Sequence, residues 1–357
     1  MQSLPFYDHP SAWRASDLQS KASVCIDLTP KQIEVLASAL ASVTKKELAI
    51  EDIRREHFDL SLIETDVQRW HDEIQHGKGL LVLTGWPSNQ YSEEENAVVY
   101  WGLSTWFGEA QSQSLAGDKL GHVVGVGGKD PRERAYRNST ELALHTDASD
   151  IVGMMCLRPA KEGGLSGYCS GPAVYNYLLE HHEDELNRLI EGYYYHRFGE
   201  EAPGESAITE EKIPVFSIVD NIVSISYLRM YIDLAFRELA EGPSERDQRA
   251  LDVLDDVAHS PEFRLNFMME SGDIAYFNNY VVLHTRTEFN DHDDPAKRRH
   301  LLRLWLKAHD ARPVNHLIAA FTDRDGIQPQ EGKTSYFEGG LDYSENIPHR
   351  DNLNIAD

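Results

Sequence analysis

Residues 140–147 read Thr-Glu-Leu-Ala-Leu-His-Thr-Asp, an alternating run that ends on His145 and places Asp147 one spacer later. Alternation predicts a β-strand with Leu142 and Leu144 on one face and His145 on the other. Such a strand end delivers an imidazole and a carboxylate to the same side. Two imidazoles and one carboxylate on one face of a metal suit iron(II) and leave positions open for oxygen and substrate. The stretch therefore predicts part of a metal site in a β-rich fold.

The His-x-Asp spacing alone is not selective, because further pairs begin at His57, His182, His292 and His349. Two of them lie in charged, helix-like sequence, one lies in a turn-like segment, and one lies in the C-terminal tail. We expect these four pairs to be solvated surface. Taken alone, the pair at His145 fits a structural contact as well as a metal site.

Two later segments supply partners for this pair. Residues 272–284 are a Gly-Asp turn followed by a β-rich run that ends on a second histidine, His284. Residues 298–307 read as another strand, with Arg299 and Arg303 on one side. A guanidinium pairs well with a carboxylate because its planar fork donates two parallel hydrogen bonds. The arginines therefore predict either a site for a carboxylate ligand or an internal salt bridge.

The order of these segments resembles the iron(II)- and 2-oxoglutarate-dependent dioxygenases of the TauD/TfdA type, including their gamma-butyrobetaine hydroxylase branch. That pattern is His-x-Asp at a strand end, Gly-Gly-x-Thr/Ser about twenty residues later, a distal histidine after a Gly-Asp turn, and Arg-x-x-x-Arg in a strand. The resemblance spans about residues 77 to 310. The matching parts are, in chain order, His145 with Asp147, Gly163 to Ser166, Gly272 to His284, and Arg299 to Arg303.

The resemblance implies a mainly β fold with flanking helices (α+β), built on a double-stranded β-helix (jelly-roll, cupin-like) core. It implies that His145, Asp147 and His284 ligate iron(II). Because Asp147 is retained where related halogenases have a small residue, halogenation is disfavoured. It further implies that Arg303 grips the distal carboxylate of 2-oxoglutarate. Arg299 and Ser166 are expected to assist.

The reaction implied by the resemblance consumes 2-oxoglutarate and oxygen and releases succinate and carbon dioxide. Its expected outcome is hydroxylation of an unactivated C–H bond in a small molecule, such as an amino acid, an amine, a carboxylate or a natural-product intermediate. Desaturation or oxidative cyclisation by the same centre is the alternative within enzymes. A jelly-roll module that only binds or senses a metal is the alternative outside them.

Composition agrees with a globular enzyme that acts on small molecules. The chain has 357 residues, 41% of them hydrophobic, which is enough for a large core. Its formal net charge of -25 would repel nucleic acid and anionic membranes, so neither is expected as a partner. The three cysteines have no metal-binding spacing, and the N-terminus lacks a basic segment followed by an apolar one. We therefore expect a cytoplasmic protein, and homo-oligomerisation stays open.

The sequence pattern divides the chain into two parts that form one catalytic unit. Residues 1–110 read as a helical and strand lead-in packed on the core, and residues 111–357 read as the jelly-roll core. The core carries a helical insertion at about 173–260 and a C-terminal extension at about 310–357. Helices are expected at 30–43, 66–75, 93–107, 173–189, 227–239 and 244–259, and strands at 79–85 and 192–196.

Three residues outside the metal pattern are candidate substrate ligands. Arg137 and Asn138 lie in the Gly-rich segment 122–138, which reads as a loop or hairpin that approaches the metal. The alternative for this segment is an exposed loop. Arg229, in the insertion, is a candidate for binding a carboxylate of the substrate.

Overall fold

The computed structural model describes residues 4–18, 20–124, 139–240, 242–320 and 326–332. Its helices are α1 (Ala15–Leu18), α2 (Pro30–Lys45), α3 (Glu64–Gln75), α4 (Glu93–Ser104), α5 (Gly171–His181), α6 (Glu183–Glu191), α7 (Arg229–Glu238) and α8 (Glu245–His259). Its strands are β1 (Cys25–Asp27), β2 (Leu80–Thr84), β3 (Gly108–Ala110), β4 (Leu120–Val124), β5 (Ile151–Arg158), β6 (Glu162–Gly163), β7 (Ser166–Ser170), β8 (Phe216–Val219), β9 (Ile222–Ile225), β10 (Arg264–Phe267), β11 (Ile274–Asn278), β12 (Val282–Arg286), β13 (Phe289–Asn290) and β14 (His300–Ala308).

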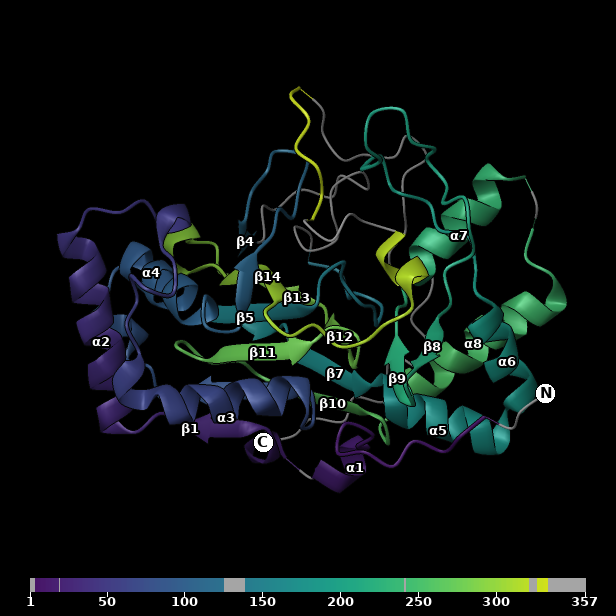
Figure 1. The fold of residues 1–357 in the computed structure, drawn as a ribbon, viewed down its shortest axis with the longest axis horizontal. Helices are drawn as coiled ribbons and strands as arrows, with labels where there is room; N and C mark the ends of the chain where they lie inside the picture. Colours follow the sequence, from purple (N-terminus) through teal and green to yellow (C-terminus); the bar gives the residue numbers. More distant parts are fainter. Residues whose placement is uncertain (1–3, 19, 125–138, 241, 321–325, 333–357) are drawn as a thin grey trace.

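Two sheets form the centre of the molecule. The larger has seven strands in the order β1-β2-β11-β5-β14-β3, with β4 also paired to β14, and the smaller has the order β10-β7-β12. Every pairing in them is antiparallel except β1 with β2. Figure 1 shows α2, α3 and α4 at one end of the molecule and α5 to α8 at the other, with the sheets between them. In the described part of the chain the sheets do not close into a barrel.

Alternating side chains divide the core into three clusters. On β14, Leu302, Leu304 and Leu306 pack with α2, α3 and α4, whereas Leu301 and Trp305 face the smaller sheet. Alternate residues of a strand point to opposite faces, so one strand serves both layers. A third cluster joins the outer face of the smaller sheet to α5, α6, α7 and α8. The space between the two sheets is therefore lined by inward-pointing side chains from both.

Most of the predicted helices are present. The helix predicted from Thr29-Pro30 is α2, in which Thr29 Oγ1 accepts a hydrogen bond from the Gln32 N–H at 3.3 Å and Pro30 occupies the first turn. The helix predicted at 173–189 is broken at His182, where the backbone leaves the helical region and α5 gives way to α6. The break lets α5 pack on β9 while α6 packs on β8 and α8. No helix in the described ranges is long and apolar enough to cross a membrane.

The predicted strand that ends at His145 is wrong. The segment meets β12 through one isolated bridge, between His145 and His284, and through a hydrogen bond of 3.0 Å from the Leu142 N–H to the Arg286 carbonyl oxygen. The neighbouring backbone groups bind side chains instead: the Leu144 N–H donates to His259 Nε2, and the Leu142 carbonyl accepts from the Thr285 hydroxyl. Because side chains satisfy these groups, a regular ladder cannot form.

One other expectation also needs correction. Residues 192–196 form no regular strand, since Tyr193 and His196 make only single bridges. The β-rich run from Gly272 to His284 consists of two strands in different sheets, β11 and β12, joined by a turn. The first 110 residues supply β1, β2 and β3 to the larger sheet. Within the Gly-rich segment 122–138, residues up to Val124 belong to β4, and residues 125–138 lie outside the described chain.

Candidate metal centre and co-substrate cavity

Three potential metal ligands meet where the segment 143–147 crosses β12. His145 and His284 exchange backbone hydrogen bonds of 3.1 and 2.9 Å, which sets their rings side by side with centroids 4.2 Å apart. Asp147 follows two residues later and faces both rings. One ligand atom from each of the three residues lies within 4.8 Å of the others. The structure thus brings together the three residues that the sequence selected.

Each imidazole presents its Nε2 to Asp147. His145 Nδ1 lies 2.9 Å from the Ala143 carbonyl oxygen and donates to it, which orients the ring, and His145 Nε2 lies 3.8 Å from Asp147 Oδ1. His284 Nε2 lies 3.7 Å from Asp147 Oδ2. Burial, followed by the nearby His145, lowers the pKa of His284 to about 3. A neutral imidazole is the form that binds a metal.

Asp147 is held as an ionised carboxylate. Burial by itself would raise the pKa of Asp147, but Arg303, the two histidines and Trp305 outweigh it and bring this pKa to about 2. The Asn279 side chain accepts a hydrogen bond from the Asp147 N–H at 2.8 Å and donates one to the Asp147 carbonyl oxygen at 2.5 Å. The carboxylate is therefore charged, and its backbone is clamped at both polar groups.

This donor set fits iron(II). Two neutral imidazoles and one carboxylate on one side of a metal leave the opposite side free. Among the described residues, the buried Nδ1 of His284 has no hydrogen-bond partner. The rings of His284 and Phe277 lie 4.8 Å apart, so the free side faces a partly apolar surrounding.

The three ligands line a cavity of about 180 Å³ between the two sheets and the helical insertion. Its substrate-side wall is apolar and is formed by Leu142, Phe198, Leu228, Met230 and Tyr231. The rings of Phe198 and Tyr231 stack with centroids 5.5 Å apart. The rest of the lining includes the hydroxyl of Ser166 and four guanidinium groups, from Arg229, Arg286, Arg299 and Arg303. An acidic small molecule would suit such a cavity.

Strand register places these polar groups at two levels. His284 is opposite Tyr168, and Arg286 is opposite Ser166 in the next inward-facing pair, about 7 Å further along the strands. Arg299 belongs to this second level, because its guanidinium and that of Arg286 both lie over the ring of Phe289, at 5.4 and 4.7 Å. Ser166 starts β7 directly after the turn that Gly163 and Gly164 form at positive φ.

Arg303 lies at the level of the metal ligands. Its Nη1 is 3.5 Å from Asp147 Oδ2, and its Nε donates to Gln113 Oε1 at 2.7 Å. Arg299 is different, since its buried Nη1 has no hydrogen-bond partner among the described residues, and burial lowers the pKa of Arg299 to about 10. The two arginines therefore differ in level and in how far their guanidinium groups are engaged.

Arg229 lines the cavity, but its guanidinium is already paired. Its nitrogens donate to Asp233, Asp252 and Asp255, and Asp255 also accepts from the hydroxyl of Tyr227 at 2.7 Å. This arrangement does not favour Arg229 as the group that binds a substrate carboxylate. The other two predicted substrate ligands, Arg137 and Asn138, lie outside the described residues.

Four residues of the site were missed at the sequence level. Arg286 and Trp305 each follow a predicted site residue by two positions on the same strand, so the strand period could have identified them. Asn279 lies in the turn between β11 and β12, and Gln113 lies between β3 and β4. Neither has a sequence signal, because both become neighbours of the site only through the sheet topology.

The architecture and the donor set together define a non-haem iron oxygenase centre: a His-Asp-His face opens into an apolar cavity with buried guanidinium groups. The family model for "taurine catabolism dioxygenase TauD, TfdA family" matches residues 44–305, and the chain belongs to this family. It is an iron(II)- and 2-oxoglutarate-dependent oxygenase, not a module that only binds or senses a metal. The match does not separate the gamma-butyrobetaine hydroxylase branch from the rest.

Relatives and solved structures agree with this assignment. FR-33289 synthase of Streptomyces rubellomurinus (strain ATCC 31215) is 27% identical over 308 residues, which cover 85% of this chain and 90% of the relative. Taurine hydroxylase-like protein SAT17 of Stachybotrys chartarum is 27% identical over 306 residues, covering 82% and 77%. Asparagine oxygenase in complex with Fe(II), 2S,3S-3-hydroxyasparagine and succinate superposes with a TM-score of 0.62 at 17% identity, covering 80% of this chain and 93% of the other. The non-heme iron oxygenase OrfP with Fe and alpha-ketoglutaric acid gives a TM-score of 0.57 at 14% identity, covering 79% and 94%.

Proposed function

We propose that the protein hydroxylates an unactivated C–H bond of a small acidic or zwitterionic molecule. The observation that carries this proposal is the cavity: a cluster of metal ligands at one level, guanidinium groups beside it, and an apolar wall from the insertion. Bound iron(II), together with 2-oxoglutarate and oxygen, supplies the oxidant for such a reaction and releases succinate and carbon dioxide. The protein positions the reactants, excludes water from the site and stabilises charge electrostatically.

His145, Asp147 and His284 are the proposed iron ligands. Their support is the neutral state of His284, the ionised state of Asp147, and the shared face described above. Substitution of a ligand tests this directly. His145→Ala should abolish iron-dependent succinate formation, whereas His292→Ala, in a rival His-x-Asp pair, should leave it unchanged. Full turnover by the His145 variant would refute the ligand assignment.

The distal carboxylate of 2-oxoglutarate is proposed to bind Arg299, with Ser166 and Arg286 beside it. Ser166 and Arg286 lie two residues further along their strands than the pair of His284 and Tyr168, on the same inward face. A five-carbon dicarboxylate that chelates a metal at one end can span about that distance, roughly 7 Å. Arg303, which lies beside Asp147, is then left to face the substrate side of the metal.

The whole chain is proposed to work as one catalytic unit on a double-stranded β-helix core. The two facing sheets, which share one inner cluster of side chains, support this reading. The insertion contributes the apolar wall, with Phe198 and Tyr231, and would select the substrate. A cytoplasmic location is proposed because the three cysteines are unpaired and two of them are buried.

The substrate class is supported by the names of the solved structures, which record an asparagine oxygenase with bound 2S,3S-3-hydroxyasparagine and the oxygenase OrfP with bound (3S)-hydroxy-L-Arg. The decisive experiment begins with an anaerobic titration of the iron(II)-loaded protein with 2-oxoglutarate. A panel of amino acids, amines and carboxylates is then scored by succinate release and product mass. Hydroxylation adds one oxygen, whereas desaturation or cyclisation removes two hydrogens. Absence of the metal-to-2-oxoglutarate charge-transfer band would refute the proposed function.

A further inference from the structure

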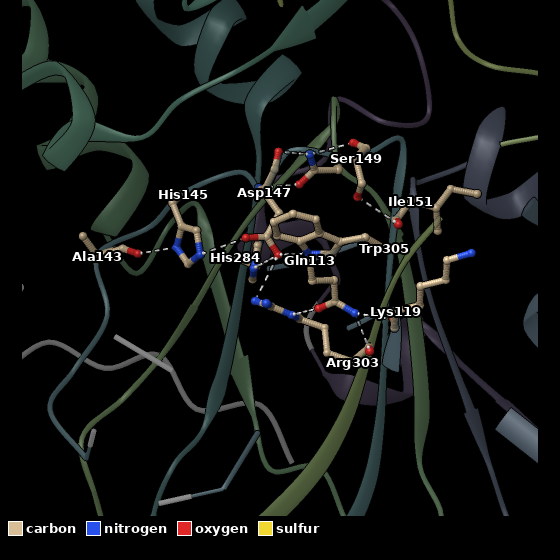
Figure 2. A network of polar contacts seen from close by, with 11 residues as sticks. Gln113, Lys119, Ala143, His145, Asp147, Ser149, Ile151, His284, Arg303 and Trp305 are labelled. Atoms are coloured by element: carbon tan, nitrogen blue, oxygen red, sulfur yellow. Dashed lines mark hydrogen bonds and ion pairs between the residues drawn. The ribbon is translucent and has the colours of Figure 1, made fainter. Parts of the chain in front are cut away.

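The two oxygens of the Asp147 carboxylate have different surroundings (Figure 2). Oδ2 accepts a hydrogen bond from the indole Nε1 of Trp305 at 2.8 Å, and it faces Arg303 Nη1 at 3.5 Å and His284 Nε2 at 3.7 Å. Oδ1 receives no hydrogen bond from any described residue and faces His145 Nε2 at 3.8 Å. The carboxylate therefore has one oxygen that is hydrogen-bonded and one that is not.

The structure also restricts how the carboxylate can move. Asn279, which is buried, clamps the backbone of Asp147 and also donates to the Ser149 carbonyl oxygen at 2.9 Å. Trp305 is 4% exposed and belongs to the central strand β14, so its indole cannot follow a rotating carboxylate. Rotation of the Asp147 carboxylate away from Trp305 would break this hydrogen bond and leave the buried indole N–H without its acceptor.

Gln113 restrains the neighbouring guanidinium group of Arg303. Gln113 accepts from Arg303 Nε and donates from Nε2 to the carbonyl oxygens of Arg303, at 2.9 Å, and Lys119, at 2.7 Å. Its amide is thus fully engaged and fixes the guanidinium. Arg303 Nη1 lies 3.5 Å from Asp147 Oδ2, which is longer than a direct charged hydrogen bond. The hydrogen bond on Oδ2 comes from a neutral donor, which leaves more of the carboxylate charge for a metal.

We propose that Trp305 is a positioning residue that keeps Asp147 a one-oxygen ligand. Its indole N–H occupies Oδ2, so only Oδ1 reaches the metal, and the coordination position that Oδ2 would otherwise take stays open for the 2-oxo acid. The proposal rests on the proposed function, because it assumes that His145, Asp147 and His284 bind a metal. It adds a residue for which the sequence pattern has no role.

The test removes the N–H and measures metal binding without turnover. Loss of an outer partner of a ligand costs about 10- to 100-fold in metal affinity. Trp305→Phe should therefore raise the cobalt(II) dissociation constant of the anaerobic protein by about that factor. It should also change the visible spectrum of the cobalt(II) form, because Oδ2 becomes free to coordinate. Trp305→benzothienylalanine, which keeps the ring shape and lacks the N–H, should reproduce both effects.

A matched control separates this effect from loss of packing. Trp101 is also buried, and its Nε1 donates to the Ile53 carbonyl oxygen at 3.1 Å, away from the cavity. Trp101→Phe should lower thermal stability and leave cobalt(II) affinity and spectrum unchanged. Wild-type affinity and spectrum in both Trp305 variants would overturn the proposal, and so would equal losses in the Trp101 control. If the wild-type protein binds no metal, the proposed function fails first.

Discussion

Arg299→Gln tests the assignment of the co-substrate site. Arg299 is 4% exposed, and no described residue accepts a hydrogen bond from its Nη1, so this group is proposed to bind a ligand carboxylate. A hydrogen bond to a charged group contributes about 1.5–3 kcal/mol. Its loss should weaken 2-oxoglutarate binding by about 10- to 150-fold, because each 1.4 kcal/mol is a factor of ten. The lower part of that range is expected, since Ser166 and Arg286 remain in place.

The assay is an anaerobic titration of the iron(II)-loaded protein, with the charge-transfer band as the signal. 2-Oxobutyrate chelates in the same way but lacks the distal carboxylate. The wild-type protein should prefer 2-oxoglutarate strongly, and Arg299→Gln should remove most of that preference without changing iron affinity. Arg246→Gln, at an exposed arginine paired with Glu191, is the control and should behave as wild type.

The same titration distinguishes the two arginines of the Arg-x-x-x-Arg strand. Arg303→Gln should retain the preference for 2-oxoglutarate over 2-oxobutyrate, because Arg303 lies at the level of the metal. If Arg303→Gln loses the preference and Arg299→Gln keeps it, the structural argument fails and the assignment made from sequence stands.

Three further outcomes are expected. Arg229→Gln should destabilise the fold by about 3–5 kcal/mol, because it leaves buried Asp255 without its cation; thermal unfolding measures this, and an unchanged midpoint would contradict the structural role. Gln113→Leu should free Arg303 to pair with Asp147 and weaken cobalt(II) binding; tighter or equal binding would refute the restraint. Burial lowers the pKa of His300 to about 4. The charged or titratable groups facing His300 are Glu93, His122 and Arg158. In the unfolded chain His300 takes up a proton near pH 6.5, whereas in the folded chain it does so only near pH 4. The free energy of unfolding is therefore unaffected by His300 above pH 6.5 and decreases as the pH falls from 6.5 towards 4. The loss is at most about 1.4 kcal/mol per pH unit, reduced by screening. His300→Gln should flatten this dependence, and an unchanged slope of unfolding midpoint against pH would contradict it.

Local signals in the sequence were sufficient for elements whose stability is local. The capping box at Thr29 and the apolar spacing after it identify α2, because both operate within a few turns of one helix. The segment 140–147 shows the limit of such signals. Its alternation predicts a strand, yet its backbone groups bind Thr285 and His259, which are more than a hundred positions away. No local pattern reports partners at that separation.

The three residues proposed as metal ligands were predictable because metal chemistry restricts residue type, spacing and order. The different surroundings of the two arginines were not predictable. Arg299 and Arg303 are only four positions apart, but Arg299 precedes β14 and lies over the ring of Phe289, whereas Arg303 belongs to β14 and lies beside Gln113 and Asp147.

The sequence by itself indicated the family and the oxidising co-substrate, and it selected the three residues proposed as metal ligands, since each depends on a few residue types in a fixed order. Tertiary structure decided the different surroundings of Arg299 and Arg303, the pairing of Arg229 with three aspartates, and the hydrogen bond from Trp305 to one oxygen of Asp147. These contacts join segments that are distant in the chain. Sheet register and burial set them, and neither is encoded in any single stretch of residues.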